Sequence, residues 1–70
     1  MDLPKILGRN VRELRKGKGM SQEELALECD MKRSYVSDIE RGTRNPSVKA
    51  LARLAVALRV EPEVLIKRRL

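Results

Sequence analysis

The segment 33–38 carries polar side chains of the types that form hydrogen bonds with the edges of nucleic-acid bases. An arginine can bind one guanine through two hydrogen bonds, a hydroxyl can donate or accept one, and a carboxylate can accept one from cytosine. If the segment is helical, these side chains lie away from Val36 and Ile39, which would face an apolar core. The candidates for base contact are Arg33, Ser34, Tyr35, Ser37 and Asp38.

Most of these candidates also have an ordinary structural interpretation. Arg33 could bind a phosphate or stay in solvent, and Ser34 could cap the first turn of its helix. Tyr35, the only aromatic residue, could pack partly against the preceding helix. Asp38 could pair with Arg41 three residues later, or orient Arg33. The residue types alone leave these alternatives open, so the elements that position them matter.

Two short helices are predicted around these residues. Ser21 and Glu24 have the spacing of a capping box, which predicts a helix over about 21–30. After a very short connection, apolar periodicity predicts a second helix over 33–41. Two short helices joined by a three-residue turn are the skeleton of a DNA-reading helix-turn-helix unit, here residues 21–42.

The rest of the chain also shows helical periodicity. Apolar residues recurring every three or four positions predict a helix over about 3–16 and another from the cap Ser47 to about position 58. A fifth helix is expected to open at Glu61, with Pro62 in its first turn. No stretch alternates apolar and polar residues as a half-buried strand would. The sequence therefore predicts an all-α, five-helix single domain over residues 1–70.

The charge of the chain favours a polyanionic partner. Sixteen Lys and Arg against ten Asp and Glu give a net charge of +6 over 70 residues. Residues 43–70 hold seven basic and two acidic side chains, a net of +5, whereas residues 1–42 hold nine and eight, a net of +1. A basic balance suits nucleic acid, although a solubilising surface charge is the simpler alternative.

Several classes of function are excluded by inventory. The chain has no histidine and a single cysteine, Cys29, so neither a disulfide nor a Cys/His zinc site is expected, and Cys29 is predicted to be a small core residue. No supported carboxylate pair or phosphate loop is present, and we expect no enzyme, cofactor or small-molecule ligand. The apolar runs are far shorter than the roughly 20 residues of a membrane helix, and no signal peptide is evident. A cytoplasmic protein without membrane contact is expected.

The residues of the predicted unit resemble a known family. The segments 20–26, MSQEELA, and 33–42, RSYVSDIERG, resemble the Cro/cI phage-repressor family, which includes the xenobiotic response element regulators. The resemblance covers about residues 6–65. A narrower similarity, in the opening of the second helix and the Arg-Asn loop after it, is to the small controller proteins of restriction–modification systems. One departure is Asp30, which stands where glycine is usual; Asp also tolerates a positive φ.

The resemblance implies further roles. It places Gln22 on the DNA backbone and pairs Arg15 with Glu40 as an internal ion pair between the first and third helices. The start of the second helix favours phosphate through its free amides, although Ser21 could serve as a cap alone. The expected phosphate contacts are Ser21, Gln22, Arg41, Arg44 and Asn45.

Self-association is predicted from the C-terminal segment, a dimerisation helix over 61–69. Val64, Leu65 and Ile66 are consecutive, so they cannot all face one direction on a helix. Leu65 is expected to enter the core, which leaves Val64, Ile66 and Leu70 for a second copy. Two-fold pairing would set two reading helices about 34–36 Å apart. The alternative is an apolar end cap on a monomer.

Taken together, these features predict a sequence-specific, double-stranded DNA-binding transcription regulator that binds a symmetric operator as a homodimer. Whether it activates or represses stays open; a contact between the Asp38 face and RNA polymerase would favour activation. The alternative is an antitoxin-type or other protein-interaction module of the same fold, for which only the tail 66–70 could serve as a binding segment.

Overall fold

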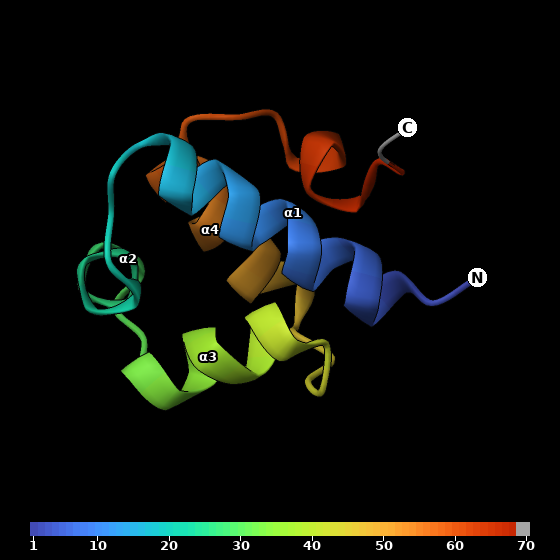
Figure 1. The fold of residues 1–70 in the computed structure, drawn as a ribbon, viewed down its shortest axis with the longest axis horizontal. Coiled ribbons are helices and arrows are strands. Elements are labelled where there is room, and N and C mark those ends of the chain that lie inside the picture. The colour runs from blue at the N-terminus through green and yellow to red at the C-terminus, as the bar shows by residue number, and fades with distance from the viewer. Residues whose placement is uncertain (69–70) are drawn as a thin grey trace.

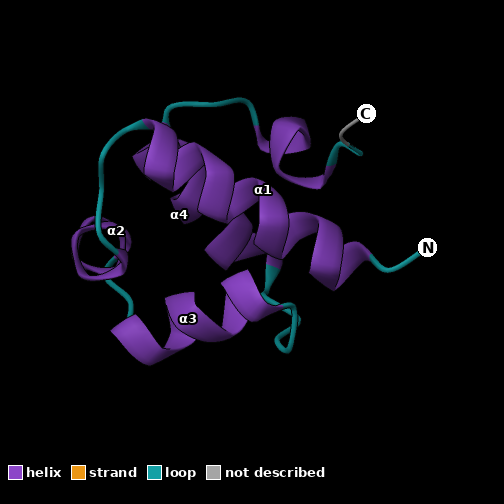
Figure 2. Ribbon diagram, in the orientation of Figure 1, coloured by secondary structure: helices purple, strands orange, loops and turns teal. Residues whose placement is uncertain are grey.

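The chain folds into four α-helices followed by a short 3₁₀ helix (Figure 1). The computed structural model describes residues 1–68. Within that range every regular element is helical and no strand occurs, as Figure 2 shows. The elements are α1 (Leu3–Gly17), α2 (Gln22–Cys29), α3 (Arg33–Arg41), α4 (Val48–Leu58) and the 3₁₀ helix η1 (Pro62–Ile66). The predicted all-α class is confirmed.

Side-chain caps fix the starts of three helices. An Asp2 carboxylate oxygen accepts from the Lys5 N–H at 3.1 Å, and the Ser47 hydroxyl oxygen accepts from the Ala50 N–H at 3.0 Å. The capping box forms as predicted: the Glu24 N–H donates to the Ser21 hydroxyl at 3.0 Å, and the Ser21 N–H donates to the Glu24 carboxylate at 2.7 Å. Each such cap satisfies a backbone donor that has no partner within the helix.

The turn between α2 and α3 depends on a left-handed residue. Asp30 has φ 55° and ψ 49°, which confirms that it replaces glycine at this position. Its N–H closes the end of α2, and the Met31 N–H donates to the Ala26 carbonyl at 2.9 Å. α3 then begins two residues later at Arg33 and ends before Gly42, whose φ is 77°. The turn therefore sets the steep crossing of α2 and α3 seen in Figure 1.

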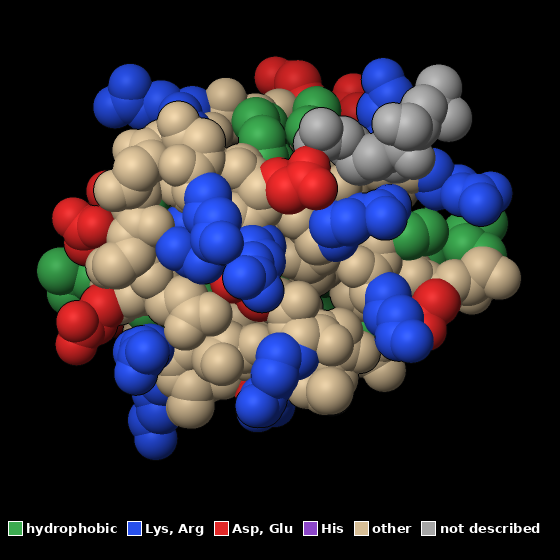
Figure 3. Space-filling view, in the orientation of Figure 1, with side chains coloured by type: hydrophobic (Ala, Val, Ile, Leu, Met, Phe, Trp, Pro, Cys, Tyr) green, Lys and Arg blue, Asp and Glu red, His purple; other side chains and the backbone are tan. Residues whose placement is uncertain are grey.

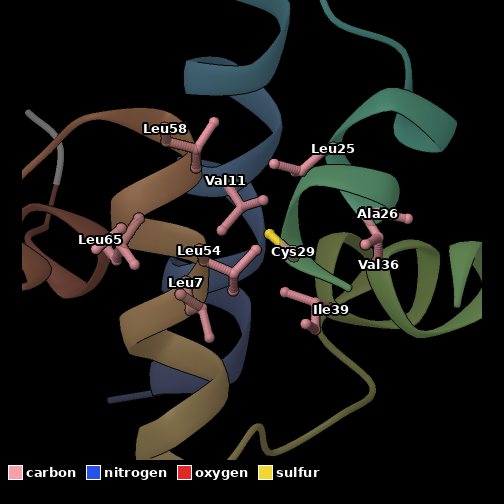
Figure 4. Close-up of a cluster of buried hydrophobic side chains, with 11 residues drawn as sticks. Leu7, Val11, Leu25, Ala26, Cys29, Val36, Ile39, Leu54, Leu58 and Leu65 are labelled. Carbon is pink, nitrogen blue, oxygen red and sulfur yellow. The ribbon is translucent and has the colours of Figure 1, made fainter. Parts of the chain in front are cut away.

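One apolar core joins all five elements. Figure 4 shows its side chains directed toward one another, with the Cys29 sulfur among them, as predicted for a core residue. Leu65 is fully buried, as predicted, and ties η1 to the helices. The core consists of Leu7, Val11, Leu25, Ala26, Cys29, Val36, Ile39, Leu54, Ala55, Leu58 and Leu65.

The predicted fifth α-helix is wrong for the described residues. The segment forms only the five-residue 3₁₀ helix η1, and the backbone is extended at Lys67, with φ −77° and ψ 133°. The reason lies in α1: the Asn10 amide donates to the carbonyls of Val64, Leu65 and Lys67 at 3.4, 2.9 and 2.7 Å. An α-helix would need the first two carbonyls for its own next turn. The end of the predicted helix, with Leu70, lies outside the described residues.

The lengths of these helices also bear on the membrane prediction. Among the described residues, no helix is both long enough and apolar enough to cross a bilayer.

Candidate nucleic-acid interface

The outward side of α3 presents the residues whose types and spacing suggested base contact. Val36 and Ile39 are fully buried and pin the helix to the core. All five candidates for base contact lie on this nine-residue helix. The exposed members are Arg33 and Ser34, and the half-buried members are Tyr35, Ser37 and Asp38. α3 thus has an apolar back and a polar front with no helix packed over it (Figure 1).

A close approach of α1 to the back of α3 sets the position of the reading helix. A Cβ atom at Gly8 would lie 2.3 Å from the Ile39 carbonyl oxygen and 2.8 Å from that of Glu40. Only glycine permits this spacing, because real Cβ atoms do not come that close to backbone oxygens. Sequence pattern does not identify Gly8, since its partner lies more than thirty positions away.

The buried carboxylate of Glu40, on α3, joins this helix to α1 through Arg15 and to α2 through Gln22. Glu40 accepts from Arg15 Nε at 2.6 Å and Nη2 at 3.1 Å, and the side chains of Arg15 and Glu40 are 10 % and 3 % exposed. Arg15 Nη1 also donates to the Met20 carbonyl at 2.7 Å. The hydrogen bond that Arg15 donates to the Glu40 carboxylate raises the pKa of the Arg15 guanidinium, against the opposing effect of burial. The pair links α1 to α3, where the family resemblance places it.

The start of α2 is less open to phosphate than the sequence suggested. The Gln22 amide donates to Glu40 at 3.0 Å, so in this structure it points to the ion pair. The Ser21 hydroxyl accepts the cap hydrogen bond from Glu24. Glu23 and Glu24 also add two negative charges to the first turn. The free backbone amides at this end could still bind a phosphate, but the carboxylates of Glu23 and Glu24 would repel it.

The exit of α3 carries a cluster that we term the arginine clasp, made of Tyr35, Asp38, Arg41 and Arg44. One oxygen of the Asp38 carboxylate pairs with Arg41, and the other accepts from Arg44 Nη2 at 3.4 Å. The Arg44 guanidinium lies 4.6 Å from the centroid of the Tyr35 ring. The predicted i,i+3 pairing of Asp38 with Arg41 is therefore present. That Arg44 joins it was not anticipated.

Charges are unevenly distributed over the surface. In Figure 3, Lys and Arg side chains project from the lower edge, where α3 lies, and from the front, where α1 lies. Acidic side chains gather at the left, over α2. The cationic groups near α3 are therefore local rather than part of a uniform positive field.

A shallow apolar groove of about 220 Å³ lies beside η1. Ile66 and Leu3 contribute to it and are 43 % and 45 % exposed. Asn45, a predicted phosphate contact in the loop after α3, also lines this groove. Val64 lies elsewhere, half-buried beside Asn10. Of the three predicted dimer-interface residues, Val64 and Ile66 therefore lie on opposite sides of buried Leu65. The third, Leu70, lies outside the described residues. The groove is lined by Leu3, Pro4, Leu7, Asn45, Pro46, Leu51 and Ile66.

Asn10 is a structural residue that the sequence pattern did not single out. It is 1 % exposed and holds η1 through three hydrogen bonds. A signal was present, since Asn10 interrupts the apolar face of α1, three positions after Leu7 and four before Leu14. Most polar side chains on a buried face have hydrogen-bond partners, and here the amide nitrogen of Asn10 has them. Its partners, 54 to 57 positions away, were not predictable from local pattern.

Comparison with known proteins points to one family. The sequence profile described as "Helix-turn-helix" matches residues 11–65. The control protein C.BamHI of Bacillus amyloliquefaciens is 50 % identical over 62 residues, which cover 87 % of this chain and 76 % of that protein. The crystal structure of the restriction–modification controller protein C.AhdI from Aeromonas hydrophila superposes with a TM-score of 0.86 at 47 % identity, covering 89 % of this chain and 94 % of that one.

A further solved structure includes DNA. The restriction–modification controller protein C.Esp1396I, determined as a tetramer in complex with its natural 35 base-pair operator, superposes with a TM-score of 0.83 at 34 % identity. The match covers 93 % of this chain and 86 % of that one.

Proposed function

We propose that this chain, which belongs to the helix-turn-helix family, is a sequence-specific DNA-binding regulator of transcription. We propose further that it binds a two-fold symmetric operator as a homodimer, as a controller of a restriction–modification system. The similarity to C.BamHI and C.AhdI supports the narrower role.

The way in which α3 packs on the core and exposes its polar side carries the proposal. Its apolar side is buried against the core, while Arg33 and Ser34 are exposed at its N-terminal end. A helix that packs on the core through one side and exposes polar side chains on the other can enter the major groove, where the four base pairs are distinguishable. Gly8 and the buried Arg15–Glu40 pair hold it in place. Arg33 is the expected reader of guanine, and Arg41 and Arg44 are the expected phosphate contacts.

The apolar groove beside η1 supports the homodimer. A second copy that covers Ile66 and Leu3 would remove from water two large apolar side chains that are nearly half exposed. A two-fold pairing through this groove is isologous, so both copies would use the same residues. C.Esp1396I, which was solved as a tetramer on its operator, gives a precedent for assembly on DNA.

Selection from random duplexes tests the proposed function. The purified protein is incubated with the pool at about 0.15 M salt, which suppresses non-specific phosphate binding, and the retained duplexes are sequenced. A two-fold symmetric motif with half-sites about one helical turn apart is expected. Absence of enrichment, with binding that only falls as salt rises, would overturn sequence-specific function.

A matched pair of variants tests the role of Arg33. Arg33→Ala should relax base preference at one symmetric position per half-site, with a discrimination loss of about 1–3 kcal/mol. Arg53→Ala, an exposed position on α4, should leave the motif unchanged. A uniform loss of affinity on all sequences would instead make Arg33 a phosphate contact.

A second pair tests the dimer surface. Ile66→Glu should dissociate the dimer in sedimentation and weaken operator binding together, because it places a charge in the apolar groove. Val56→Glu introduces the same charge at a residue that is 78 % exposed on α4. If Val56→Glu dissociates the protein and Ile66→Glu does not, the interface lies on α4.

A further inference from the structure

The arginine clasp places an acidic side chain on the surface proposed to meet DNA. Asp38 is 27 % exposed in its side chain and pairs with Arg41 and Arg44, which are 65 % and 47 % exposed. Arg44 also covers the Tyr35 ring. All four residues are individually candidates for DNA contact, yet in the free protein they contact one another.

The clasp is built into the chain rather than formed by chance between long side chains. The main-chain carbonyl of Asp38 accepts from both the N–H and the hydroxyl of Thr43, at 3.1 and 3.2 Å. With Gly42 in the left-handed conformation, these bonds turn the loop back over the end of α3. Residue 38 thus anchors the loop through its backbone and holds the loop's Arg44 through its carboxylate.

We propose that Asp38 is a specificity-determining residue: it keeps Arg41 and Arg44 paired until operator DNA, which α3 reads, displaces it. This inference rests on the proposed function. Non-specific DNA offers only phosphates, which must compete with Asp38 for both arginines and meet a carboxylate of their own sign. Operator DNA offers the same phosphates and also, in register with α3, a base-edge donor such as a cytosine amine, from which the displaced Asp38 carboxylate can accept a hydrogen bond. This contact offsets the cost of opening the clasp on the operator alone. Asp38 therefore lowers non-specific affinity more than operator affinity.

The acidic groups next to Asp38 on α3 and at the start of α2 differ from it in their surroundings. Glu40 lies on the same helix but is buried and occupied by Arg15 and Gln22. Glu23 and Glu24 lie in the first turn of α2, and Glu24 is engaged in its cap. The selective effect should consequently be lost on substitution at position 38 alone.

The test compares Asp38→Asn with Glu63→Gln, which removes the same charge from an exposed site on η1 away from the clasp. Binding to the selected operator and to a scrambled duplex of equal length is measured over a range of salt. Asp38→Asn should tighten scrambled-duplex binding by about tenfold and steepen its salt slope by about 0.9 for each additional phosphate that the freed arginines neutralise. Operator binding should change less, so the ratio of the two affinities falls. Glu63→Gln should leave that ratio unchanged.

A double-substitution cycle assigns the effect to the clasp. In an Arg44→Gln background, Asp38→Asn should tighten scrambled-duplex binding by clearly less than in the wild type, because one of its partners is gone. Equal effects of Asp38→Asn and Glu63→Gln would overturn the proposal. So would a loss of operator binding with scrambled-duplex binding unchanged, because Asp38 would then be a base contact that does not restrain the arginines. Failure of the proposed function itself is distinguishable, because the wild-type protein would then select no operator.

Discussion

Substitution of Gly8 by alanine tests whether the contact between α1 and α3 sets the position of the reading helix. The added Cβ would lie 2.3 Å from the Ile39 carbonyl oxygen. An ordinary contact between carbon and oxygen is about 3.3 Å, so the two helices must separate by about 1 Å. The backbone fixes the position of the Cβ atom, and its partner is a backbone carbonyl, so no side-chain rotation can relieve the contact.

The expected loss of stability follows from two opposing effects. Overpacking costs about 1–3 kcal/mol, and a clash with backbone belongs at the upper end of that range. Alanine in place of glycine within a helix returns about 1 kcal/mol. The net loss is about 2 kcal/mol, which lowers the melting temperature of a domain of this size by roughly 8–16 °C. Thermal unfolding followed by circular dichroism measures it.

The same helix supplies a matched control. Gly17, the last residue of α1, has open space around the position that a Cβ atom would occupy, with nothing within 4 Å, and its φ is not positive. Gly17→Ala should therefore raise stability by about 0.4–1 kcal/mol. If Gly8→Ala also unfolds at or above the wild-type temperature, the close packing of α1 on α3 is not a constraint, and the reasoning fails.

Three further outcomes follow from buried polar groups. Glu40→Gln should lower the free energy of unfolding by about 3 kcal/mol or more in urea titrations, because it leaves the buried Arg15 without a counter-charge; a loss under about 1 kcal/mol would contradict this. Burial raises the pKa of the Cys29 thiol, so its contribution to stability is complete below the unfolded-state pKa of about 8.5 and is lost as pH rises through the higher folded-state value. The urea concentration at the unfolding midpoint should decrease above about pH 9 in the wild type and decrease less in Cys29→Ala. Identical pH dependence in the two proteins would refute the prediction. Asn10→Ala should cost about 1–3 kcal/mol and expose η1 to amide hydrogen exchange, because three carbonyls lose their donor; unchanged protection at Leu65 would show that core packing alone holds the segment.

Local signals made most of the helix boundaries predictable. The capping box at Ser21 and Glu24 involves neighbours three positions apart, so its geometry is contained in the sequence. The family resemblance placed Asp30 at the turn position where glycine is usual, and aspartate tolerates the positive φ found there. Arg59, which ends α4 with φ 58°, carries no such signal.

Contacts between distant segments explain what was not predicted. The start signal at Pro62 correctly marked a helical turn, but the length of that turn depends on Asn10, whose amide takes the carbonyls needed for another turn. The candidate interface shows the same limit. Periodicity identified which side of α3 faces outward, whereas the pairing of Arg44 with Asp38 depends on the return of the loop after Gly42.

The position of Glu40 shows why a buried charge is retained at this site. A buried ion pair adds little net stability compared with apolar residues of similar volume, so stability alone does not account for it. Its geometry offers a better reason: one carboxylate accepts from Arg15 on α1 and from the side chain of Gln22 at the start of α2, while belonging to α3 itself. Apolar packing would tolerate sliding between these helices, but two directional hydrogen bonds on one oxygen do not. In a protein whose proposed function requires the start of α2 and the front of α3 to meet the same DNA, that restriction on their relative position is the property that the ion pair provides.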